Sequence, residues 1–277
     1  MSISIKKASL ITWLFLGIYL SINLLPILWL LSTSIKPDAL ANAYPPTLIP
    51  WPITFEAYSD ALEKFSFAAN LRNSLIIALG STAISGGLGV LAAYSFSRFR
   101  FPGDRLLMIL ALVARMVAPI ALVVPFLILA RYLSLFNSKL VLIIANTYLN
   151  LPFVIWLMKG FLDGISTDLD DAALIDGCNH LQAMYKVILP LALPGLAATL
   201  ILVFLFSWNE FLFAWALTSN LDAEPLTVGL KDVVGEQTVL WSLLSAAGVF
   251  TMLPAIIFAL LFQRYIVSGL ATGAVKG

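Results

Sequence analysis

The chain has 277 residues, of which 61% are hydrophobic and 11% are charged, and its formal net charge is +1. A soluble domain usually carries about 25% charged residues, so this composition favours a membrane protein. The small net charge provides no basic excess for binding a nucleic acid. A single cysteine and a single histidine exclude an intrachain disulfide and the usual zinc sites.

Apolar segments long enough to cross a bilayer recur along the sequence. A transmembrane helix needs about 20 predominantly apolar residues. We therefore predict one all-α membrane domain over residues 1–277, a polytopic helix bundle with about six spans, at residues 10–33, 72–96, 106–130, 140–162, 191–217 and 243–266. The first apolar run is about two dozen residues long, against 7 to 15 for a signal-peptide core, so we expect a retained helix.

The distribution of Lys and Arg predicts the orientation of these spans. With Lys6 and Lys7 on the cytoplasmic side, that side collects nine basic residues and the outer side six; the outer ones are Lys36, Lys64, Arg72, Arg131, Lys139 and Lys231. Because cytoplasmic loops carry the excess of Lys and Arg, we expect both termini to be cytoplasmic. The same count places the loop at residues 163–190 in the cytoplasm and those at about 34–70 and 218–242 outside.

Several residues predict local features of the bundle. The outer segment contains Pro45, Pro46, Pro50 and Pro52 before an expected helix at about 54–64. Small residues at positions 81, 85 and 89 predict close helix packing. We expect kinks where proline interrupts the third and fourth spans, at Pro119, Pro125 and Pro152.

The loop at residues 163–190 has the pattern of a short helix, a turn and an amphipathic helix. Thr167 with Asp170 resembles a capping box, and acidic residues follow at the positive end of the helix. Gly177 is expected to end the first helix, and Asn179 with Gln182 to begin the second, which runs until Pro190. Such a pair can be a connector on the membrane surface. Ala172 and Ala173 instead favour a docking element, because small side chains let another protein approach the backbone closely.

The fifth span carries polar residues in an apolar context. Glu210 is predicted in the middle of a helix, where an ionisable group costs about 2.5 to 3.5 kcal/mol and needs a partner or a water-filled cavity. Arg115 in the third span is a candidate partner, either in a structural ion pair or along a pathway. A sugar pathway combines aromatic faces with neutral hydrogen-bonding groups. The pathway candidates are Arg115, Asn146, Tyr148, Asn150, Trp208, Asn209 and Glu210.

The loop residues resemble the conserved cytoplasmic loop of permeases from ATP-binding-cassette (ABC) importers. An acidic residue and two alanines at 171–173 are followed by Gly177 and by Leu189 and Pro190 at the family's spacing, although Asp171 and Val187 replace the usual Glu and Ile. Residues 208–211 and 268–277 are similar to motifs of the smaller membrane subunit of maltose-type carbohydrate permeases. The resemblance extends nearly from end to end.

This resemblance implies a set of partners and a coupling site. The implied partners are a second permease subunit, two ATPase subunits, an extracytoplasmic solute-binding protein and a sugar, in a prokaryotic plasma membrane; no nucleic acid is expected. The tail at about 267–277 is expected to reach the ATPase dimer, and the 218–242 loop to project toward the binding protein. The implied ATPase-coupling residues are Asp171, Ala172, Ala173, Asp176, Gly177, Leu189 and Pro190.

Three functions are compatible with the sequence to different degrees. The leading hypothesis is a sugar-translocating subunit of an ABC importer, without catalytic residues, metal or cofactor of its own. The chain lacks the Gly-rich phosphate loop of ATPases, so ATP and Mg²⁺ are expected on the partner subunits. The alternative is a proton-coupled secondary transporter that uses Glu210. An intramembrane enzyme is disfavoured, because no nucleophile and base pair or metal-ligand cluster is evident.

Overall fold

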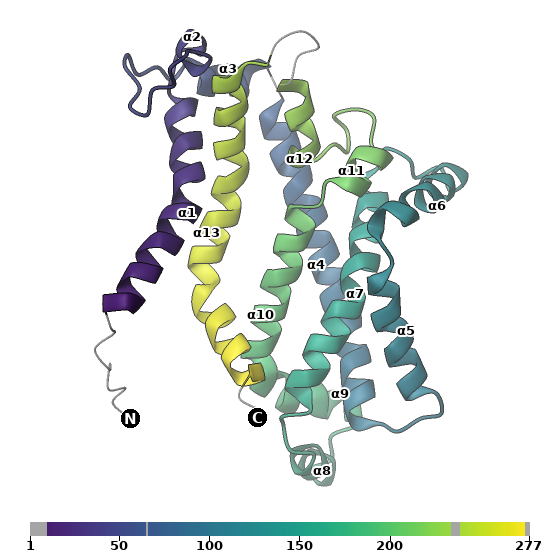
Figure 1. The fold of residues 1–277 in the computed structure, drawn as a ribbon. Coiled ribbons are helices and arrows are strands. Elements are labelled where there is room, and N and C mark those ends of the chain that lie inside the picture. The colour runs from purple at the N-terminus through teal and green to yellow at the C-terminus, as the bar shows by residue number, and fades with distance from the viewer. Residues whose placement is uncertain (1–9, 65, 234–238, 275–277) are drawn as a thin grey trace. The chain divides into compact units, whose positions relative to one another are not determined.

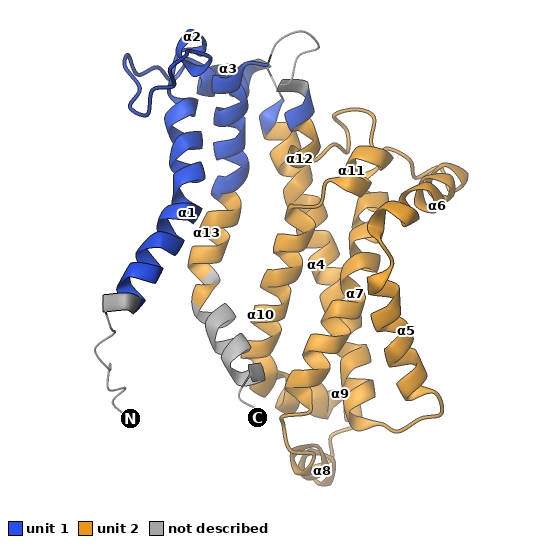
Figure 2. Cartoon of the chain, viewed as in Figure 1, with its two compact units in different colours: residues 1–67, 230–253 blue, residues 68–229, 254–277 orange. Residues whose placement is uncertain are grey.

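The computed structural model describes residues 10–64, 66–233 and 239–274, and it confirms the predicted all-α fold (Figure 1). Five described helices are long and apolar enough to cross a membrane, and the number is six if one bent helix pair counts as a span. The chain divides into two compact units, residues 1–67 with 230–253 and residues 68–229 with 254–277 (Figure 2). The prediction of a single domain therefore stays a prediction.

The first unit contains α1 (Leu10–Ser34), α2 (Asp38–Ala41), α3 (Glu56–Lys64), the 3-10 helix η2 (Leu230–Val233) and the first part of α13 (Trp241–Ala274). The start of α3 lies two residues after the start of the predicted 54–64 helix. The Tyr58 and Phe250 rings meet edge to face, with centroids 5.3 Å apart. Lys36 is buried: its ammonium donates to the Thr47 carbonyl and lies 4.5 Å from the Trp29 ring centroid. Burial lowers the pKa of Lys36.

The second unit contains the remaining helices. In chain order they are α4 (Phe67–Arg98), α5 (Asp104–Met116), α6 (Pro119–Tyr132), α7 (Lys139–Leu162), α8 (Asp168–Ile175), α9 (His180–Ala183), the π-helix η1 (Met184–Ile188), α10 (Leu189–Trp208), α11 (Leu212–Leu217) and α12 (Leu226–Gly229). Its core joins α4, α7 and α10 through buried side chains that include Val90, Val154 and Val203. The predicted small-residue stripe packs here, because Ser81 donates to Ser207 over 2.9 Å and Gly89 faces Val154.

The predicted third span is two helices rather than one. The axes of α5 and α6 differ by 96°, and the break lies at Val117 and Ala118. Pro119 begins α6, where its missing N–H is not needed, and it holds the preceding Ala118 in an extended conformation with ψ 126°. The expectation of a kink within a continuous helix is therefore wrong at Pro119. Pro125 and Pro152 lie inside α6 and α7.

The sequence predicts that the helix after Gly177 ends at Pro190, but in the structure this helix continues beyond Pro190. It passes through the π-turn η1 into α10, so residues 180–208 form one long apolar helical segment. The Leu189 N–H donates to the Met184 carbonyl five residues back. The wider π-turn shifts the hydrogen-bond register just before Pro190, which has no N–H to donate.

The observed bounds of the C-terminal tail and of the loop at 218–242 also differ from the predicted ones. α13 continues to Ala274, so the predicted tail at 267–277 begins inside a helix, and residues 275–277 lie outside the described residues. The predicted loop at 218–242 contains the short helices α12 and η2, and residues 234–238 are likewise outside the described part.

Candidate functional site

α8 begins without the predicted capping box. Thr167 has helical dihedral angles, φ −65° and ψ −22°, and its side chain makes no capping hydrogen bond. Ser166 provides a capping contact instead, because its hydroxyl accepts a hydrogen bond from the Asp168 N–H over 3.3 Å. Asp170 is unavailable for a capping box, since its carboxylate points to another helix.

The end of α8 is the turn that the sequence predicted. Gly177 has φ +86°, its N–H donates to the Leu174 carbonyl, and the Cys178 N–H donates to the Ala173 carbonyl. This is a Schellman motif, in which a left-handed residue closes the helix. The capping box at the start of α9 is also confirmed: the Asn179 side chain accepts from the Gln182 N–H over 2.9 Å, and the Gln182 side chain accepts from the Asn179 N–H over 3.0 Å.

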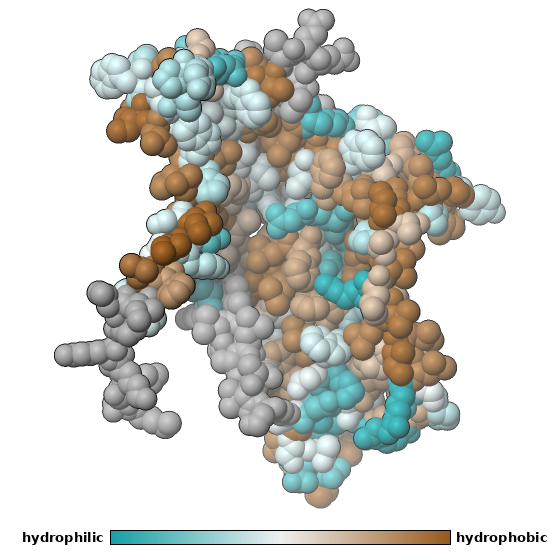
Figure 3. All heavy atoms as spheres, viewed as in Figure 1, coloured by the Kyte–Doolittle hydropathy of each residue, from teal (hydrophilic) through white to brown (hydrophobic). Residues whose placement is uncertain are grey.

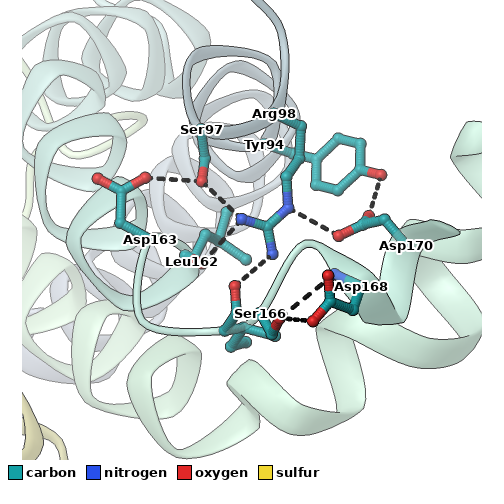
Figure 4. Close-up of polar contacts among 9 residues, drawn as sticks. Tyr94, Ser97, Arg98, Leu162, Asp163, Ser166, Asp168 and Asp170 are labelled. Carbon is teal, nitrogen blue, oxygen red and sulfur yellow. Dashed lines mark hydrogen bonds and ion pairs between the residues drawn. The ribbon is translucent and has the colours of Figure 1, made fainter.

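A buried ion pair fixes α8 to the end of α4 (Figure 4). Arg98 Nε lies 2.8 Å from Asp170 Oδ2, and the two side chains are only 6% and 9% exposed. The Tyr94 hydroxyl donates to the other carboxylate oxygen over 2.6 Å. The Arg98 guanidinium also donates to the carbonyls of Leu162 and Ile165, over 3.1 and 3.0 Å. One arginine therefore joins α4, α8 and the segment that leaves α7.

A second set of contacts supports the same junction. The Ser97 hydroxyl donates to Asp163 Oδ1 over 2.7 Å (Figure 4), and Lys159 pairs with Asp163 Oδ2 over 2.6 Å. The Phe99 and His180 rings meet edge to face, with centroids 5.2 Å apart. Sequence reasoning missed Tyr94 and Arg98. The one available signal was a basic residue at the end of an apolar span, which is common in membrane helices.

The opposite face of α8 is open. Asp171 and Ala172 are exposed, and Ile175 is 86% exposed although it is a large apolar residue. Ala173 is only 4% exposed and packs inside the chain, so the expectation that both alanines face outward is wrong for Ala173. The other predicted coupling residues also differ in exposure. Asp176, Gly177 and Pro190 are exposed, whereas Leu189 packs against the core.

Glu210 does not lie in the middle of a helix, as predicted, but at the break between α10 and α11. Its carboxylate oxygens accept from the N–H groups of Phe213 and Ala214 over 2.8 and 3.0 Å. No ion pair joins Glu210 to Arg115, and both residues are among those described. The suggested pair is therefore wrong, and the Glu210 carboxylate is bound by two backbone N–H groups instead. The Arg115 guanidinium instead lies 4.7 Å from the Phe153 ring centroid.

Five of the seven predicted pathway residues nevertheless meet at one pocket of about 210 Å³ in the second unit. The other two do not line it: Trp208 is buried and stacks on Phe204, and Asn209 is exposed. Phe206 also lines the pocket, and sequence reasoning missed it. The predicted residues that meet there are Arg115, Asn146, Tyr148, Asn150 and Glu210.

Comparison with known proteins identifies the family. The family model described as binding-protein-dependent transport system inner membrane component matches residues 85–272, which include α8 and most of the second unit. The chain belongs to this family. Among similar proteins, the trehalose transport system permease protein SugB of Mycobacterium tuberculosis is 40% identical over 257 residues, covering 92% of this chain and 93% of SugB.

Two further comparisons support the same family assignment. The Escherichia coli inner membrane ABC transporter permease protein YcjP is 34% identical and covers 95% of this chain and 94% of its own. The crystal structure of a bacterial ABC transporter involved in the import of the acidic polysaccharide alginate contains a similar chain: the TM-score is 0.81 at 27% identity, over 92% of this permease and 95% of that chain. This chain is therefore a multi-pass membrane permease of the binding-protein-dependent type.

Proposed function

We propose that this permease is a membrane subunit of an ATP-driven importer that carries a sugar. The cargoes for which its relatives are named support a sugar: the relatives include a trehalose permease, a sulfoquinovosyl glycerol permease and a diacetylchitobiose permease. These cargoes share a glycosyl unit and differ in their other groups. The proposed cargo is accordingly an oligosaccharide, disaccharide or polyol, delivered by an extracytoplasmic binding protein.

The proposed complex contains a second permease subunit and two ATPase subunits on the cytoplasmic side. ATP and Mg²⁺ bind to the ATPases, because this sequence has no phosphate-binding loop of their kind. The Lys and Arg distribution supports cytoplasmic N- and C-termini and a cytoplasmic α8. The complex belongs in a prokaryotic plasma membrane.

The exposed face of α8 is the proposed ATPase contact. Ile175 is 86% exposed and stands beside the exposed Asp171 and Ala172, so the face combines an apolar anchor, a negative charge and a low-bulk position. Exposed apolar residues rimmed by polar ones are typical of protein interfaces. This exposed face is the observation on which the proposal depends.

The anchor of α8 explains how a contact there moves the bundle. The Arg98 guanidinium bonds to Asp170 on α8 and to the Leu162 carbonyl at the end of α7, and its own helix is α4. A displacement of α8 is therefore transmitted to two long helices through charged hydrogen bonds, which are stronger than neutral ones. Closure of the ATPase dimer shifts the bundle between outward-open and inward-open states.

An Ile175→Asp variant tests this function. Placing a carboxylate on the exposed face should abolish co-purification of the ATPase and ATP-dependent sugar uptake, while Ile175→Leu keeps both because the apolar contact remains. Neither substitution should lower the thermal stability of the permease, since the side chain is exposed. Normal ATPase association by Ile175→Asp would contradict docking through this face.

A further inference from the structure

The pocket beside α7 contains a buried hydrogen-bond acceptor without a donor. Asn146 is 2% exposed, and its Nδ2 donates to the Leu142 carbonyl over 3.0 Å. Its Oδ1 has no hydrogen-bond partner among the described residues, although the residue lines the pocket. Buried polar atoms are rarely left unpaired, because each has lost its hydrogen bonds to water. A ligand with a hydrogen-bond donor would satisfy this atom.

Arg115 presents hydrogen-bond donors to the same pocket. Its guanidinium lies against the Phe153 and Phe206 rings, 4.7 and 5.6 Å from their centroids. No carboxylate in the described part of the chain lies within ion-pair distance of it. The nearby Glu210 carboxylate accepts two backbone N–H groups of α11. The pocket thus offers an amide acceptor, guanidinium donors and a carboxylate that is already engaged.

This combination discriminates between classes of ligand. An anion without hydroxyl groups would accept from Arg115 but would leave Asn146 Oδ1 unsatisfied, and a sugar acid, although its hydroxyls can donate, would be repelled by the Glu210 carboxylate. A cation would be repelled by Arg115. A hydroxyl group both donates and accepts, so neighbouring hydroxyls on one ring satisfy Asn146 and Arg115 together. Tyr148, which is 38% exposed, adds an aromatic face for the apolar side of a sugar ring.

We propose that this pocket is a subsite of the translocation pathway that binds one neutral glycosyl unit. The inference rests on the proposed function, and it assigns to this subunit a direct contact with the cargo. The volume of about 210 Å³ supports a single unit. Pockets for drug-sized ligands measure about 300 to 1,000 Å³, so a whole oligosaccharide does not fit.

Saturation-transfer NMR on the intact complex in lipid nanodiscs tests the subsite. The probes are three neutral disaccharides, trehalose, maltose and cellobiose, and the anionic sugar glucuronate. We expect saturation of at least one neutral disaccharide and none of glucuronate above empty nanodiscs. Asn146→Leu, which keeps the number and branching of the side-chain heavy atoms and removes the acceptor, should weaken binding of that disaccharide about tenfold, the effect of one hydrogen bond.

Thr147→Val is the matched control. The Thr147 hydroxyl is also buried and has no hydrogen-bond partner within the described part of the chain, but the residue does not line the pocket, so removal of this hydroxyl should leave sugar binding unchanged. ATPase co-purification, measured on the same samples, reports on the proposed function separately. Absence of binding for every neutral disaccharide, equal binding by Asn146→Leu, or preferred binding of glucuronate would each overturn the subsite even when the ATPase is bound.

Discussion

Arg98 and Asp170 form a buried ion pair across 72 residues of sequence, with 2.8 Å between Nε and Oδ2. Asp170→Asn removes the negative charge and leaves the guanidinium buried without its counter-ion. Removing one partner of a buried pair typically costs about 3 to 5 kcal/mol. We expect a lower melting temperature of the purified permease and loss of ATPase co-purification, both measured in detergent.

Asp168→Asn is the control for this charge. Asp168 is exposed on the same helix, and the hydrogen-bond partner of its carboxylate among the described residues is Ser166, so the substitution should change the melting temperature and ATPase binding far less than Asp170→Asn does. Replacing both members of the buried pair by apolar residues should recover part of the stability, because no unpaired charge remains. An Asp170→Asn variant as stable as the native permease would show that the pair does not hold α8.

Gly177→Ala should destabilise the α8 turn. Gly177 has φ +86°, and an added Cβ would meet no atom within 4 Å, so the whole effect is conformational. A left-handed conformation costs a residue with a Cβ roughly 1 to 2 kcal/mol. Limited proteolysis between α8 and α9 should become faster, and Gly177→Asn should be milder because Asn tolerates this conformation.

Gly160→Ala is the comparison for the turn. Gly160 lies inside α7 with open space around its Cβ position and no positive φ, so alanine should stabilise the helix by roughly 0.5 to 1 kcal/mol. The two substitutions add the same methyl group and are expected to act in opposite directions. Equal melting temperatures for the two variants would contradict the role of the left-handed turn.

Local chemistry made part of the site predictable. Gly177 and the Asn179 and Gln182 pair act through bonds to residues within a few positions, so the sequence pattern alone indicated the turn and the second helix start. Arg98 and Asp170 meet only after α4 and α8 are packed, and no local pattern pairs them. The misassigned capping box at Thr167 has the same cause, because Asp170 is used by a distant partner.

The sequence also predicts the membrane spans only in part. Hydropathy located the long apolar segments, but it does not register a change of direction. The 96° bend before Pro119 and the break at Glu210 both lie within continuous apolar stretches. The sequence predicts that Glu210 needs a counter-ion, whereas in the structure its carboxylate accepts hydrogen bonds from the N–H groups of Phe213 and Ala214 in α11. Hydropathy assigns a charge a depth in the bilayer without identifying its hydrogen-bond partner.

Gly89→Ala should disrupt the contact between α4 and α7. A Cβ at this position would overlap the Val154 side chain, which is fully buried in the core. Overpacking of this kind costs typically 1 to 3 kcal/mol. Gly87→Ala, two residues away on the same helix, meets nothing within 4 Å and should be neutral or stabilising. Thermal unfolding of the two variants side by side tests the close approach, which equal melting temperatures would refute.

Glu210 offers a test that separates a capping role from proton coupling. Its carboxylate accepts from Phe213 and Ala214, so Glu210→Ala should lower stability by about 0.5 to 2 kcal/mol, as loss of a helix cap does. Glu210→Gln retains a side-chain oxygen acceptor and should recover part of that loss. Thermal unfolding of both variants gives the comparison.

Uptake by the native complex completes the test. In an importer driven by a partner ATPase, sugar accumulation in proteoliposomes requires ATP and persists when a protonophore collapses the proton gradient. A proton-coupled transporter shows the reverse dependence, because protonation of Glu210 would then drive each cycle. Accumulation that follows the proton gradient without ATP would assign Glu210 a transport role and refute ATPase coupling through α8.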